Sequence, residues 1–277
     1  MKRYIIGLVL VLGAFSVSDA QDEKIKGDRN VTVKQTYLDA FQGLIISTEL
    51  DIDLVYNAKP SVEIEADDNL HDVIVFEVSD GVLSIGATKR ITSRRKLNIT
   101  INYSEPLNLI EVHDKSELHS LTSLELNDVE LTTTGNSKTY LNIKAKNFKY
   151  TSEGKSKMRL NLSADSTAIV LSDDSKLEAL INSPSATYDL YQRADADIEG
   201  DAENVSFRID NSSNFKGKNY TIMVASLLIE GNSDATLHVE DSISINASGD
   251  SEIYLFGEPK ISLDTFTGTC KLQKKEL

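Results

Sequence analysis

The chain has 277 residues, of which 40% are hydrophobic and 26% charged, with no Trp. Lys and Arg number 29 against 43 Asp and Glu, and the resulting net charge of −14 argues against a nucleic-acid-binding protein, which needs a basic surface. The single Cys excludes an intramolecular disulfide framework and a Cys-rich zinc site.

The first residues have the pattern of an export signal. Lys2 and Arg3 precede an apolar run over residues 5–17, and Ser18 and Ala20 supply small residues before Gln21. The run is shorter than the roughly 20 residues of a membrane span. We therefore expect residues 1–20 to be a signal peptide, and the mature chain to be exported without an integral membrane segment.

Residues 21–105 predict a β-rich N-terminal segment. Residues 57–60 and 79–81 are rich in turn-forming types. The strands expected between and around these turns are residues 44–56, 61–66, 73–78, 81–86 and 97–103. No repeat is evident here, so we expect either less regular coils or a cap that covers the first coil of the region beyond residue 105.

Beyond residue 105 the sequence repeats at intervals of 18 to 21 residues, with a mean near 19. Each unit has a turn with a small residue at one place, which we call the small-residue position. Gly often stands two residues before it, where a turn requires positive φ. The small-residue position is occupied by Ser116, Ser137, Ser156, Ser175, Ala194, Ser213, Ser233, Ser251 and Cys270.

Apolar residues recur at fixed distances from the small-residue position, and they alternate with polar ones. Six residues before it stand Ile110, Leu131, Tyr150, Ile169 and Tyr188. A period of two is typical of strands rather than helices. We predict an all-β fold, a right-handed parallel β-solenoid (β-helix) with coils of about 19 residues over 106–272, followed by a charged tail at 273–277. Such narrow coils leave no room for an internal ligand cavity, so binding must use outer faces or edges.

A family resemblance rests on these motifs. An export signal, a β-rich segment and turns such as T-G-N-S-K (134–138), E-G-N-S-D (230–234) and A-S-G-D-S-E (247–252) resemble the auto-transporter adhesin family with a head GIN domain, common in Bacteroidetes. Residues 62–70, 76–78 and 81–85 look like the N-terminal part of that family. The resemblance implies a β-helical protein at the periplasm or cell surface of a Gram-negative bacterium, and it carries no catalytic residues over. Two turns, at 172–175 and 191–194, depart from it because they lack Gly.

Two sets of outward residues are candidates for a binding face. The first set lies one residue after the small-residue position, where successive coils carry Lys138, Lys157 and Lys176. They form either a recognition stripe or an ordinary solvated column whose charges nearby acids neutralise. Exposed aromatics are few, and the candidates for a sugar platform are Tyr140, Tyr191 and Tyr254.

Acidic residues cluster on neighbouring coils. Glu178 and Asp197 occupy the same column, about 4.8 Å apart at the backbone. This spacing suits a solvated acidic face with Arg159 as a neighbour, a Ca²⁺ site or a pair of glycosidase carboxylates. The candidate calcium ligands are Glu178, Asp195, Asp197 and Glu199.

The sequence carries no nucleophile–base pair, P-loop or dinucleotide motif. We therefore predict an exported, non-enzymatic solenoid that needs no cofactor and binds polysaccharide, an envelope protein or a second copy of itself through its lateral face. The alternatives are a carbohydrate-active β-helix enzyme, either lyase or hydrolase, and a purely structural envelope protein.

Overall fold

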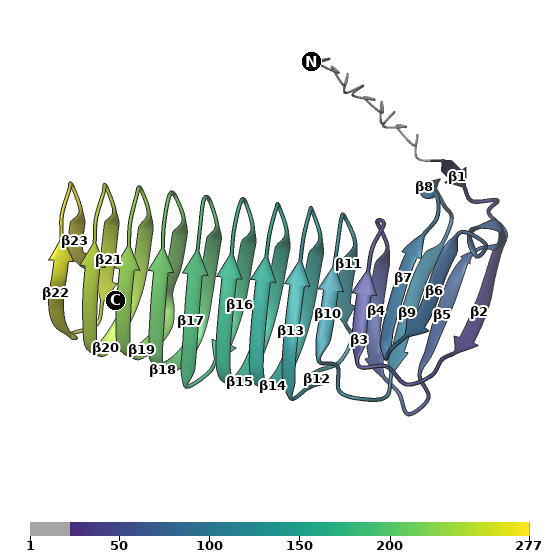
Figure 1. Ribbon diagram of the computed structural model, residues 1–277, viewed down its shortest axis with the longest axis horizontal. Coiled ribbons are helices and arrows are strands. Elements are labelled where there is room, and N and C mark those ends of the chain that lie inside the picture. The colour runs from purple at the N-terminus through teal and green to yellow at the C-terminus, as the bar shows by residue number, and fades with distance from the viewer. Residues whose placement is uncertain (1–22, 277) are drawn as a thin grey trace, which may run out of the picture.

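The computed structural model describes residues 23–276, so the expected signal peptide lies outside the described residues. Figure 1 shows a rod of stacked coils with the N-terminal strands at one end and β22 and β23 at the other. The strands of neighbouring coils pair in parallel, with partners 17 to 21 residues apart, over most of the rod. The predicted all-β solenoid is confirmed.

Each coil contributes one strand segment before the small-residue position and one after it. These segments line two sides of the rod, which we call the pre-turn sheet and the post-turn sheet, and the longest strands run from one side into the other. The pre-turn sheet contains, in order, β7 (Val82–Ala87), β3 (Gly43–Ile46), β10 (Leu109–Val112), β13 (Asp128–Thr133), the second parts of β14 (Lys138–Ser152) and β15 (Lys157–Leu171), β17 (Ser185–Leu190), the second parts of β18 (Asp195–Ile209), β19 (Asn214–Ile229) and β20 (Asp234–Ala247), and β22 (Lys260–Phe266).

The post-turn sheet is built from the other halves of the same coils. It contains β9 (Leu97–Tyr103), β4 (Asp51–Tyr56), β11 (Glu117–Ser120), the first parts of β14 and β15, β16 (Lys176–Asn182), the first parts of β18, β19 and β20, β21 (Glu252–Phe256) and β23 (Lys271–Lys274). The short β12 (Leu124–Glu125) pairs with β14 after β11 has ended.

The N-terminal segment joins the rod out of sequence order. The coil of β3 and β4 lies between β7 and β9 on one side and β10 and β11 on the other, with parallel pairing throughout. Antiparallel strands then close this end: β5 (Ser61–Asp67) pairs with β9, β2 (Val31–Tyr37) with β5, and β6 (Ile74–Ser79) with β7. A separate two-stranded sheet joins β1 (Lys24–Lys26) to β8 (Arg90–Ser93).

Between the sheets, the apolar columns expected from the repeat fill the core. Ile110, Leu131, Tyr150, Ile169 and Tyr188 are all at most 1% exposed. Some polar members are buried with partners: Thr133 Oγ1 lies 2.9 Å from Tyr150 Oη, and Tyr188 Oη donates to Tyr220 Oη at 3.1 Å. Thr139 Oγ1 and Thr167 Oγ1 are buried without a hydrogen-bond partner among residues 23–276. Burial raises the pKa of Tyr220 to about 12. One layer of side chains therefore fills the coil.

The turns repeat the same backbone conformation. The residue two before the small-residue position has a positive φ in each coil, and in five coils it is Gly. A side chain would not fit at those glycines, because a Cβ on Gly249 would lie 2.3 Å from the carbonyl oxygen of Gly231 in the turn beneath. At these glycines, the stacked turns thus approach one another too closely for a side chain.

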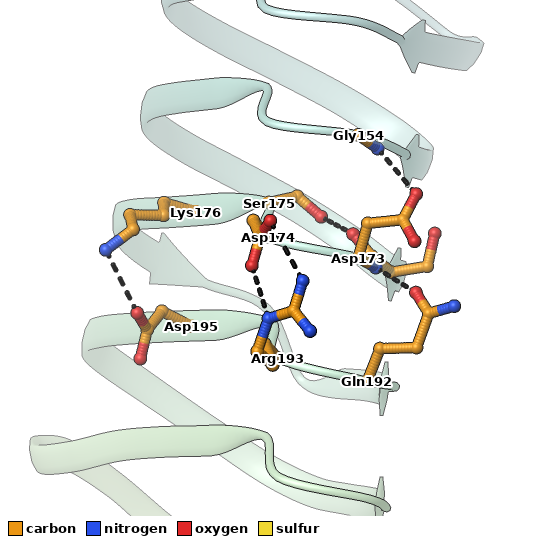
Figure 2. A network of polar contacts seen from close by, with 9 residues as sticks. Gly154, Asp173, Asp174, Ser175, Lys176, Gln192, Arg193 and Asp195 are labelled. Atoms are coloured by element: carbon orange, nitrogen blue, oxygen red, sulfur yellow. Dashed lines mark hydrogen bonds and ion pairs between the residues drawn. The ribbon is translucent and has the colours of Figure 1, made fainter.

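Two turns without Gly keep this conformation by using side-chain hydrogen bonds. Asp173 and Gln192 have φ of 58° and 66°. Asp173 Oδ2 accepts a hydrogen bond of 3.0 Å from the backbone N–H of Gly154, and Gln192 Oε1 accepts one from the N–H of Asp173, as Figure 2 shows. The side chains of Asp173 and Gln192 therefore each accept a hydrogen bond from a backbone N–H of the preceding turn.

The small-residue position is buried, as a packing role requires. All of its Ser members and Ala194 are at most 1% exposed. Ser156 Oγ donates to the carbonyl of Glu153 at 2.9 Å, and Ser175 Oγ makes the same contact with Ser172. Cys270, the last member, is partly exposed because the described chain places no coil over it.

A substitution at this position tests the packing. Ser175→Ala should cost no more than about 1 kcal/mol, the net value of one hydrogen bond, because Ala194 already fills the position one coil on. Ser175→Leu should cost about 1–3 kcal/mol through overpacking. Thermal or urea unfolding measures both, and a neutral Leu variant would show that the position is not tightly packed.

A second substitution separates backbone strain from the close approach of the turns. Gly249→Ala should cost about 2–3 kcal/mol, because the residue has φ +84° and its new Cβ meets the Gly231 carbonyl. Gly81→Ala is the matched control, with φ +76° and open space, and should cost about 1 kcal/mol. Equal unfolding free energies for the two variants would contradict the close approach.

Candidate functional site

The candidate lysines lie side by side on the outer face of the post-turn sheet. The register places Lys138 beside Lys157, Lys157 beside Lys176, and Lys176 beside Asp195. We call Lys138, Lys157 and Lys176 the lysine column. The residues two places further along the same strands form a second column, which we call the aromatic column. The sheet therefore displays two parallel columns whose members repeat once per coil.

The two outer lysines of the column are neutralised by carboxylates. Lys138 forms an ion pair with Glu117, which raises the pKa of Lys138 through a hydrogen bond. Lys176 Nζ lies 3.2 Å from Asp195 Oδ2, and Figure 2 shows this ion pair. Lys157, between them, has no ion pair within residues 23–276. The uncompensated positive charge of the column is therefore centred on Lys157.

The aromatic column begins with a ring stack and continues with an ion pair. The rings of His119 and Tyr140 are stacked, with centroids 4.6 Å apart and an angle of 5° between their planes. One coil further on, Arg159 Nε donates to Glu178 Oε2 at 2.9 Å. Tyr140 and Arg159 are in register, so the two residues occupy neighbouring places in the aromatic column.

These residues line a shallow depression of about 640 Å³ on the sheet. Its apolar part is supplied by Leu121 and Leu180, which are 61% and 43% exposed. Its polar part includes Asn142 and Asn161, which are neighbours in register. The depression thus combines amide, guanidinium, aromatic and aliphatic groups with the carboxylates of Glu178, Asp197 and Glu199 on an open surface.

The wall of the depression comes from an irregular coil. Ser116 and Ser137 are 21 residues apart, two more than the usual spacing. In this coil the post-turn strand ends at Ser120 and resumes as β12 at Leu124, which leaves Leu121 outside the sheet. The spacing of 21 is the signal in the sequence that could have located this depression.

The other two candidate tyrosines lie elsewhere. Tyr191 is in a turn under the Arg208 guanidinium, 5.5 Å from the ring centroid. Tyr254 is on β21 and donates to Glu252 Oε2 at 2.5 Å. Neither lines the depression, so the three tyrosines do not form one platform.

The four acidic candidates do not converge on a common point. Glu178 is paired with Arg159, Asp195 with Lys176 and Asn214, and Glu199 accepts a hydrogen bond from Asn219 at 3.2 Å. Asp197 is next to Glu178 in register, as expected. Among the residues that the structure describes, no group of three or more His, Cys, Asp or Glu is arranged to hold a metal ion.

Comparison with solved structures supports the fold. Crystal structures of a "putative adhesin" from Parabacteroides merdae and another from Parabacteroides distasonis match with TM-scores of 0.63 and 0.64, covering 91% and 92% of this chain and 99% and 100% of theirs. A "putative lipid binding protein" from Parabacteroides distasonis matches with a TM-score of 0.66 over 91% of this chain and 100% of that one. Each is 18% identical, so the likeness concerns the fold alone.

The sequence itself identifies the family. No curated protein matches the chain. Over residues 23–276, no helix is long and apolar enough to cross a membrane. The family model described as "Putative auto-transporter adhesin, head GIN domain" matches residues 40–259, which is most of the chain. The protein belongs to this family.

Proposed function

We propose that the protein is an exported, non-enzymatic binding protein of the adhesin type, acting at the periplasm or cell surface, and that it holds polysaccharide on its post-turn sheet. The observation that carries this proposal is the depression lined by Tyr140, Asn142, Arg159, Asn161 and Leu180. It brings residues from successive coils onto one open surface.

The chemistry of the depression suits a carbohydrate chain. Sugar hydroxyls both donate and accept hydrogen bonds, and the amides of Asn142 and Asn161 offer both functions. Sugar rings also have apolar C–H faces, for which Leu121 and Leu180 supply exposed aliphatic surface. Because the same columns continue along the sheet, contacts that are weak at each coil add together for a polymer.

Contacts around the acidic residues favour binding over hydrolysis. A glycosidase needs two carboxyl groups free to act on one bond. Here Glu178 is paired with Arg159, while Asp197, its neighbour, stands on the open sheet rather than in a cleft that excludes water. The groups of the depression are therefore better suited to contact a ligand than to cleave it.

A glycan array, with lipid vesicles as a further arm, tests this proposal. The purified protein should bind a polysaccharide, and Tyr140→Ala with Asn161→Ala should weaken that binding at least 10-fold, because both side chains lie on the surface of the depression. Lys146→Glu, an exposed charge change outside the depression, is the control and should bind as the parent does. Binding to vesicles alone, or equal glycan binding by all variants, would contradict the proposal.

A further inference from the structure

The last strand of the pre-turn sheet leaves core side chains uncovered. In β22, Ile261, Leu263 and Phe266 are 41%, 52% and 38% exposed. They are in register with Ile243, Ile245 and Ala247 of β20, which are at most 2% exposed. Nothing in the described chain pairs with the far edge of β22, which forms the end of the rod in Figure 1.

The outer face of the same strand carries two opposite charges. Asp264 accepts hydrogen bonds from Ser244 at 2.5 Å and Ser262 at 2.9 Å, which lower the pKa of Asp264 and keep it ionised. These contacts place Asp264 on the same side of the strand as Ser262. Within residues 23–276, neither Lys260 nor Asp264 forms an ion pair.

The strand is complementary to itself when it is read in the opposite direction. If two copies of β22 pair antiparallel about Ser262, Lys260 of one faces Asp264 of the other, and Ile261 faces Leu263. Both pairs then occur twice, once on each side of the centre. The charged pairs fall on the outer face and the apolar pairs on the core side, so both sets of side chains match in the same register.

We propose that the protein forms a tail-to-tail homodimer in which β22 pairs antiparallel with β22 of a second copy, about a twofold axis through Ser262. An exposed strand edge is a template for pairing with another strand. The pairing covers Ile261 and Leu263, and gives Lys260 and Asp264 the ionic partners that they lack within residues 23–276 of one chain.

A twofold contact of this kind closes on itself and yields a dimer rather than a fibre. The lysines of β23, the last strand of the post-turn sheet, do not repel a second copy strongly, because Lys271 is paired with Glu252 and Lys274 with Glu258 in their own chain. At the other end of the rod, β2 and β5 cover the first coils with antiparallel strands. The inference is independent of any ligand on the post-turn sheet.

Sedimentation velocity across a concentration series tests the dimer. The protein should sediment as a dimer, and Lys260→Asp or Asp264→Lys should each weaken dimerisation at least 10-fold by placing like charges opposite one another. The double variant, with both changes, exchanges the two charges and should restore the dimer, whereas Lys146→Asp should leave it intact. A monomeric parent, unaffected single variants or no rescue by the double variant would overturn the proposal.

A cross-linking measurement does not depend on the charge variants folding normally. In the proposed register Ser262 faces itself across the axis, and directly opposed residues of antiparallel strands have Cα atoms about 4.5–5.5 Å apart, close enough for a disulfide. With Cys270→Ser in the background, Ser262→Cys should give an oxidised covalent dimer. Ser244→Cys, in the same column one coil earlier, should not cross-link, because β22 separates it from the partner. Failure of Ser262→Cys to cross-link, or equal cross-linking by both variants, would overturn the register.

Discussion

The structure depends on the close stacking of one turn upon the next. At each turn one residue has positive φ, and its carbonyl approaches the turn that follows so closely that a Cβ on Gly249 or Gly154 would meet it at 2.3 or 2.7 Å. A small buried residue two places further on completes the turn. Because the turns can stack only in this register, the strands on both sides are brought into parallel pairing, and the apolar columns and the outer columns follow from it.

The same constraint explains how the outer surface can vary. Inside the coil, every position is limited in size by its two neighbours, so a large residue lies between small ones, as Phe215 does between Ala196 and Ala235. Outside, each column can change charge or aromatic character from coil to coil without disturbing the backbone. The lysine column and the stack of His119 on Tyr140 are products of this freedom. A binding surface can therefore be assembled by substitutions on a fixed scaffold, which is consistent with an adhesin-type role.

Much of the rod could be predicted from the sequence because each coil carries its own turn and columns. The N-terminal coil could not, since Leu50 fills the place that Ser or Ala takes elsewhere, and its turn uses two residues of positive φ, Thr48 and Glu49. Its neighbours in the stack are also distant in sequence. The lysine column and the Glu178–Asp197 pair follow directly from the spacing. The depression does not, because its shape depends on where the two extra residues before Ser137 leave the sheet.

Removal of one whole coil tests the central role of this stacking most directly. Deleting residues 157–175 removes 19 residues and joins Ser156 to Lys176, so that Leu141 stacks on Ala179 and Tyr150 on Tyr188 in the columns that they already occupy. Circular dichroism and thermal unfolding should show a folded, cooperatively melting, shorter solenoid. Deleting residues 157–174, one residue fewer, leaves Ser175 as an extra residue in the turn between Ser156 and Lys176, where the close stacking has no room for it, and should give a markedly less stable solenoid. Equal behaviour of the two deletions would contradict the account.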